Sequence, residues 1–146
     1  MFGKTSAFAG EYEHYYSKDP ALGGEGFDHA KWLETGDDQY IPARTGTSPV
    51  KFTLRRLSSR EWIFVQDVAS KEGNGSGSWM AVALALRGID PYVDDKGKEV
   101  EIGLVRENKM QRLHDEDMDR VATVDDGYLI HELAQRVAKE SRHDPL

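Results

Sequence analysis

The feature that most constrains folding is where periodic patterns of apolar residues occur. They lie between residues 51 and 142, and residues 1–50 carry none. The first fifty residues are instead interrupted by glycine and proline, at Gly10, Gly23, Gly24, Gly26, Gly36, Gly46, Pro20, Pro42 and Pro49. Such spacing breaks helices and central strands. We therefore expect two parts: an extended N-terminal arm, residues 1–50, and a compact domain, residues 51–146.

The arm is nevertheless rich in aromatic side chains, which disordered segments lack. Tyrosine combines an apolar ring with a polar hydroxyl, which suits contacts between proteins. We expect the arm to lay its rings on another surface, either its own domain or a neighbouring subunit. The candidate partner-binding residues are Phe8, Tyr12, Tyr15, Tyr16, Phe27, Trp32 and Tyr40. We also expect the domain to fold without residues 1–45 and to lose only its ability to assemble.

The first half of the domain carries a strand signal and two helix signals. Val50, Phe52 and Leu54 alternate with polar residues, which indicates a half-buried strand. Ser58 and Glu61 form a capping-box pattern, so a helix is expected over residues 59–70, with Trp62, Ile63, Val65 and Ala69 towards the core. Residues 71–78 are rich in glycine and serine and predict a flexible connector. Residues 79–87 are apolar nearly all round and predict a buried central helix, ended by Gly88.

The second half predicts a hairpin and one amphipathic helix. Residues 92–93 and 100–102 flank a turn at residues 94–97, which is a hairpin signal. A short helix is expected to start at residues 115–120. The last helix, capped by Asp125 or Asp126, runs to about residue 141, with a stripe of Leu129, Ile130, Leu133, Ala134 and Val137. The fold class is thus α+β, with three to four helices and a short antiparallel sheet or hairpin.

Composition narrows the classes of function. The formal net charge is −7, and an acidic chain argues against a surface for the phosphate backbone of nucleic acid. The chain has no cysteine, which excludes disulfides and thiol catalysis. It has no stretch near the roughly 20 apolar residues of a membrane span. The N-terminus lacks the apolar run of a secretory signal, so cytoplasmic synthesis is expected.

No motif of the chain predicts a reaction or a cofactor. The series Gly73, Gly75, Gly77 follows a predicted helix and lacks the lysine of a phosphate-binding loop. His131 and Glu132 begin a zinc-protease pattern, but position 135, where the second histidine belongs, is Gln135. We therefore expect no catalytic, cofactor-binding or metal-binding residue. A hydrolase would need His131 or His114 beside a nucleophile in a cleft.

The order of elements from Phe52 onwards resembles small accessory proteins of tailed-bacteriophage head and tail morphogenesis, among them tail assembly chaperones. The matching pieces are the Leu-Arg-x-Leu strand at residues 52–57, the helix and turn at 83–89, the hairpin at 94–100 and Glu-Leu-Ala at 132–134. The resemblance covers about two-thirds of the chain and brings no catalytic residue with it. The aromatic arm departs from that pattern.

These observations predict a non-enzymatic phage morphogenesis or virion-associated protein that acts through protein–protein contacts. The arm would dock on neighbouring subunits, and the partners would be other phage structural proteins or copies of the chain itself, with no membrane. The protein would occur in the host cytoplasm during synthesis and could enter the virion. Two alternatives stay open. One is a cytoplasmic tail assembly chaperone that is not retained in the virion, and the other is an acidic inhibitor of a host nucleic-acid-binding protein.

Overall fold

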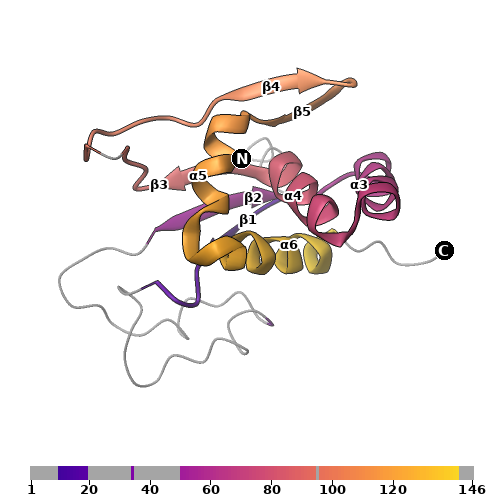
Figure 1. The fold of residues 1–146 in the computed structure, drawn as a ribbon, viewed down its shortest axis with the longest axis horizontal. Coiled ribbons are helices and arrows are strands. Elements are labelled where there is room, and N and C mark those ends of the chain that lie inside the picture. Colours follow the sequence, from indigo (N-terminus) through magenta and orange to yellow (C-terminus); the bar gives the residue numbers. More distant parts are fainter. Residues whose placement is uncertain (1–9, 20–33, 35–49, 95, 142–146) are drawn as a thin grey trace, which may run out of the picture.

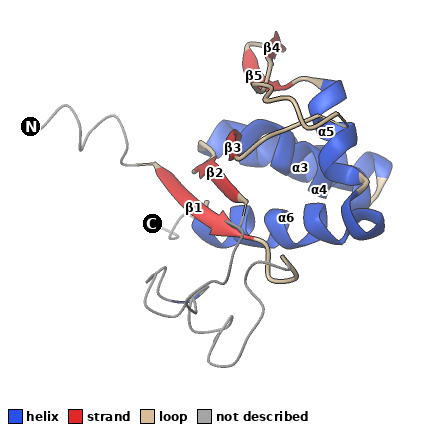
Figure 2. Ribbon diagram, turned by 90° about the vertical axis from the view of Figure 1, so that its left-hand side faces the viewer, coloured by secondary structure: helices blue, strands red, loops and turns tan. Residues whose placement is uncertain are grey.

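A computed structural model describes residues 10–19, 34, 50–94 and 96–141. Within them the fold has two layers, a three-stranded antiparallel sheet and a layer of helices packed on one of its faces (Figures 1 and 2). The sheet has the order β1 (Glu11–Tyr15), β2 (Lys51–Arg55), β3 (Leu86–Asp90). The helices are α3 (Ser59–Glu72), α4 (Asn74–Ala85), α5 (Asp115–Ala122) and α6 (Tyr128–Glu140). The predicted α+β class is confirmed.

The domain begins inside the segment that the sequence analysis assigned to the arm. Strand β1 pairs with β2 from Glu11 opposite Arg55 to Tyr15 opposite Lys51. It forms the edge of the main sheet, next to β2 (Figure 2). Its inward side chain His14 is fully buried, and Tyr16 just after it is also buried. The described fold thus includes residues 10–19, which lie before the expected boundary at residue 50. A truncation of residues 1–45 would remove this edge strand and part of the interior.

Helix α3 starts where the capping box predicts. The Ser58 hydroxyl accepts a hydrogen bond from the Glu61 amide, and the Glu61 carboxylate accepts one from the Ser58 amide. Glu61 also forms a two-bond ion pair with the Arg55 guanidinium at the end of β2. The Glu61 carboxylate thus satisfies the Ser58 amide at the start of the helix and ties α3 to the sheet.

The glycine-rich connector is helical, which corrects the prediction of a flexible tether. Only Gly73 lies outside the helices, with a φ of +105° that glycine adopts readily. Helix α4 starts at Asn74, and at Gly77 it lies so close to α3 that an added Cβ would be 2.6 Å from the Cβ of Ala69. The glycines therefore permit close helix packing here, and tertiary contact outweighs their low helix propensity.

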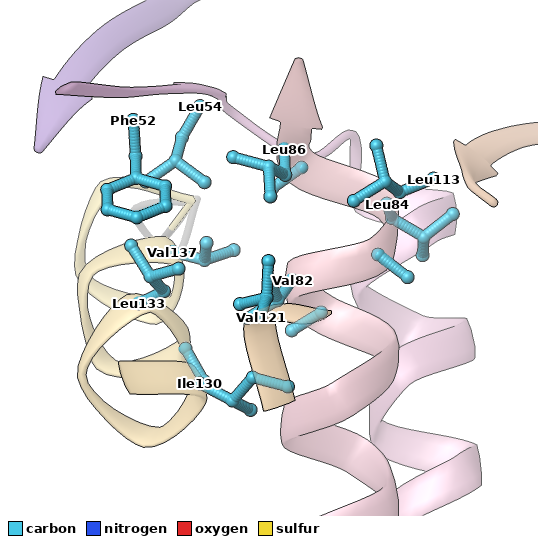
Figure 3. Packing of buried hydrophobic residues seen from close by; sticks show 14 of the residues in the cluster. Phe52, Leu54, Val82, Leu84, Leu86, Leu113, Val121, Ile130, Leu133 and Val137 are labelled. Carbon is cyan, nitrogen blue, oxygen red and sulfur yellow. The ribbon is translucent and has the colours of Figure 1, made fainter. Parts of the chain in front are cut away.

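The core surrounds the apolar end of α4. Residues 81–86 are all buried (Figure 3). Phe52 and Leu54 approach from the sheet, and Leu133 and Val137 from α6. The chain passes directly from α4 into β3, so Gly88 lies in a strand opposite Thr53 and does not end the helix as predicted.

The second half of the domain differs from its predicted details. The expected hairpin is reduced to a single bridge between Val93 and Glu99. A two-stranded sheet follows that the sequence analysis missed, formed by β4 (Leu104–Glu107) and β5 (Met110–Leu113). Its turn residues Asn108 and Lys109 both have positive φ, as in a two-residue hairpin turn. Asparagine favours such a turn, but lysine does not, which explains why the signal is weak.

The final helix is not capped by an aspartate. Asp125 and Asp126 have positive φ inside a short turn, η3 (Val124–Gly127), and Gly127 occupies the N-cap position of α6. Asp125 instead accepts a hydrogen bond from the Tyr16 hydroxyl. The turn therefore contributes to holding β1 and the residues after it on α6.

The tight contact between α3 and α4 predicts different effects of alanine at two nearby glycines. Gly77→Ala should lower the free energy of unfolding by about 1–3 kcal/mol, since its Cβ overlaps Ala69. Gly75→Ala is the matched control, because nothing lies within 4 Å of its added Cβ, and it should be neutral or slightly stabilising. Urea unfolding of both variants measures the difference. Equal stabilities would contradict the close approach of the two helices.

Candidate protein-binding surface

Three helices enclose an open groove on the surface of the helical layer. Helix α4 contacts both α3 and α6 (Figure 1), and residues of all three helices line the groove. The groove has a volume of about 260 Å³. Its lining residues are Trp62, Val65, Gln66, Ala69, Asn74, Gly77, Ser78, Ala81, His131, Ala134, Gln135 and Ala138.

The groove is shallow and neutral because of the residues that line it. Its floor carries small side chains such as Gly77 and Ala81, while Trp62 forms part of one wall. None of the lining residues is an aspartate, glutamate, lysine or arginine. A surface of this composition offers apolar contact and neutral hydrogen-bonding groups, and gives no attraction for a strongly charged small molecule.

Helix α3 also exposes apolar area beyond the groove. Ile63 was expected to face the core, but 67% of its surface is exposed. Val65 is the one buried apolar side chain of α3, and Trp62 and Phe64 pack half-buried against the core. A second hollow, of about 440 Å³, is lined by Val68 of α3 and by Trp79 and Met80 of α4, among others. We refer to the groove together with Ile63 as the α3 surface.

The tyrosines proposed as partner-binding residues contact their own domain. Tyr16 is buried, with 6% of its surface exposed. Tyr12 is half-buried, and the Arg136 guanidinium carbon lies 5.0 Å from its ring centroid, within the range of a cation–π contact. Tyr15 is half-buried in β1 opposite Lys51. For Tyr12 and Tyr16 the contacted surface is therefore the protein's own domain, one of the two surfaces expected for the arm. Phe8, Phe27, Trp32 and Tyr40 lie outside the described residues.

A buried polar cluster fastens β1 to α6. The fully buried His14 places its Nε2 atom 2.6 Å from Oε2 of Glu132. Glu132 also accepts hydrogen bonds from the Ser17 amide, at 3.0 Å, and from the Ser17 hydroxyl. On the other side of the ring, Nη1 of Arg136 lies 3.5 Å from Nδ1 of His14. Each buried polar atom named here has a partner, as a low-dielectric interior requires.

The electrostatics of this cluster favour an ionised Glu132. Burial acts against the charge of Glu132, but hydrogen bonds from His14 and Ser17 outweigh burial and hold the pKa of Glu132 below its ordinary value of 4.5. Burial and the hydrogen bond to Asp125 raise the pKa of Tyr16, so its hydroxyl keeps the proton that it donates. At neutral pH the cluster thus keeps Glu132 ionised and Tyr16 protonated.

The geometry of the cluster is that of a structural contact. Ser17 donates its hydroxyl to Glu132, and its Oγ therefore lacks the bond to a histidine that would activate it. His114 accepts from the Glu116 amide and caps α5, whereas His131 is exposed beside the groove. Across the described residues, no group of three or more histidine, aspartate and glutamate side chains is placed to hold a metal ion.

The sequence analysis missed His14 and interpreted Glu132 only as part of a failed zinc motif. The two residues are 118 positions apart, so no local pattern connects them. The one available signal is that His14 alternates with Glu11, Glu13 and Tyr15 in a strand-like order, which places it on the opposite face from those residues.

Comparisons with known proteins do not assign this chain to a family. No protein-family model, no curated protein and no solved structure matches this chain. No helix in the described part of the chain is both long and apolar enough to cross a membrane.

The buried cluster predicts a large effect of one carboxylate on stability. Glu132→Ala should lower the free energy of unfolding by about 3 kcal/mol, since it leaves the buried His14 ring and the Ser17 amide without an acceptor. Glu101→Ala, at an exposed position of a loop, is the control and should change stability by less than about 0.5 kcal/mol. Equal losses in the two variants, measured by urea unfolding, would show that the cluster does not fasten β1.

The lowered pKa of Glu132 predicts the pH range in which its charge matters. A carboxyl whose pKa is lower in the folded state stabilises the fold fully above its unfolded pKa, near 4.5, and loses that effect as pH falls through the folded pKa. The wild-type protein should therefore exceed Glu132→Gln in stability by a constant amount above about pH 5.5. The difference should shrink below pH 4.5. A difference that grows towards acid pH would contradict an ionised Glu132.

Proposed function

We propose that this chain is a non-enzymatic protein of tailed-bacteriophage assembly that acts by binding other proteins through the α3 surface. The observation that carries the proposal is the combination of a neutral, shallow groove with an isoleucine that is 67% exposed beside it. Exposed apolar area that adjoins an apolar hollow is typical of a protein-binding site.

The distribution of polar residues supports a binding role over a catalytic one. The buried titratable side chains His14, Glu132 and Arg136 are engaged with one another or with the backbone, away from the groove. The groove itself presents amide, hydroxyl and imidazole groups on a small-residue floor. Such a floor allows a helix of a partner to approach closely, with its apolar side chains against Trp62.

The assignment to phage assembly depends on the resemblance noted in the sequence. The Leu-Arg-x-Leu strand, the two helices after it and Glu-Leu-Ala in the last helix occur in the expected order. Two pieces of that resemblance do not support it, because the hairpin at residues 94–100 is a single bridge and Gly88 lies in a strand. Within this proposal the partners are other phage structural proteins or copies of the chain. The aromatic residues of the arm outside the described residues, Phe8, Phe27, Trp32 and Tyr40, remain proposed contacts with neighbouring subunits.

The proposal predicts that filling the groove blocks assembly. In the phage that encodes the chain, a nonsense mutation of this gene should abolish infectious particles, and a plasmid-borne wild-type copy should restore them. Gln135→Trp adds a large ring at an exposed position of the groove, so it should fold normally and restore titre at least about tenfold less well. Plaque titre and electron microscopy of the lysates measure the effect.

The matched control is Asp119→Trp, which places the same ring on an exposed position of α5 away from the groove. It should complement as well as the wild type. Full complementation by Gln135→Trp, or a gene that no phage or prophage carries, would refute the proposal. Mass spectrometry of purified virions then separates a virion component from a tail assembly chaperone, because only the former stays in the particle.

A further inference from the structure

We infer that the part of the α3 surface formed by Ile63 binds a second copy of this chain, through an antiparallel pairing of α3 with α3 about a twofold axis that leaves the groove open. The inference rests on the proposed function only in that the α3 surface binds protein.

The dimer contact would be formed by Arg60, Ile63 and Asp67 of α3, which we call the α3 crest. All three are exposed.

The three residues of the crest share one face of the helix. They are spaced by three and four positions, so their side chains follow one another along α3 within a narrow stripe. Ile63 stands at the centre, with a cation about one turn before it and an anion about one turn after it. The stripe adjoins Gln66 at the edge of the groove.

This spacing makes the crest complementary to itself. When two copies of α3 pack antiparallel about an axis near Ile63, Arg60 of one copy lies opposite Asp67 of the other, and the same pair recurs by symmetry. A twofold interface requires such self-complementarity, since one patch must recognise its own image. The two isoleucines meet at the axis, and their apolar area is removed from water.

The charges of the crest are available for this pairing. Within the described residues Arg60 forms no ion pair. Asp67 contacts only Lys71 of its own helix, at 3.1 Å, and both side chains of that pair are more than half exposed. An exposed pair of this kind contributes little, so it exchanges for a contact across the interface at small cost. A parallel pairing would instead place Arg60 opposite Arg60 and Asp67 opposite Asp67.

The size of the contact sets the expected affinity. One pair of 14-residue helices buries less area than the roughly 800 Å² per partner of a standard interface. The dimer should therefore be weak and reversible, with a dissociation constant of roughly 1–100 µM. Such an interface is formed in a crowded assembly and lost on dilution.

The test is sedimentation velocity of the full-length purified chain over a range of concentrations. The wild type should pass from monomer to dimer as its concentration rises to about 300 µM. Ile63→Asp should stay monomeric and folded, because the residue is exposed in the monomer. Arg106→Glu, an exposed charge reversal in the β4–β5 hairpin, is the control and should dimerise normally. A wild type that stays monomeric, or an Ile63→Asp that dimerises, overturns the inference.

Charge reversal tests the antiparallel geometry itself. Arg60→Glu alone and Asp67→Lys alone should each weaken the dimer roughly tenfold, because each creates two like-charge contacts. Mixing these two single variants should restore association as a heterodimer, in which Glu faces Lys at one contact and Asp faces Arg at the other. The double variant should also dimerise like the wild type. Failure of both rescues overturns the inference.

The outcomes also separate the dimer from the proposed function. A monomeric wild type together with a phage defect in Gln135→Trp would remove the dimer and leave a groove that binds another phage protein. A dimer that is abolished by Ile63→Asp while that variant supports phage growth fully would keep the dimer and remove its part in assembly.

Discussion

The constraint on which the rest of the structure depends is the burial of α4. Residues 81–86 present apolar side chains in all directions and are fully enclosed. A helix without a polar face needs cover on every side. The sheet covers one side through Phe52 and Leu54, α6 covers another through Leu133 and Val137, and α3 packs at Gly77. The positions of the other elements follow from this requirement.

The sheet is completed by a strand from outside residues 51–141. Strand β1 pairs with β2, although it lies in a segment whose glycine content argues against regular structure. The contact of His14 and Ser17 with Glu132 makes this arrangement specific. A polar contact inside an apolar interior tolerates one register, because a shift by one residue would turn His14 outwards and leave Glu132 unpaired.

Helix α3 is less buried than α4. It packs on α4 at Ala69 and Gly77, and Val65 is its one buried apolar side chain. Its remaining apolar area forms a wall of the groove and the exposed Ile63. The features proposed as functional therefore arise from the same packing that forms the core: α3 contacts α4 at Gly77, leaves α6 on the far side of the groove, and points its crest outwards.

The sequence alone determined the elements whose signals are local. The capping box of Ser58 and Glu61, the alternation in β2, the stripe of α6 and the apolar run in α4 all act within a few residues, and the structure confirms them. Tertiary structure alone decided where the glycine segment became helical, where Ile63 pointed and what His14 and Tyr16 contacted. These depend on partners distant in sequence, such as Glu132 and Asp125, whose proximity arises only when the chain has folded.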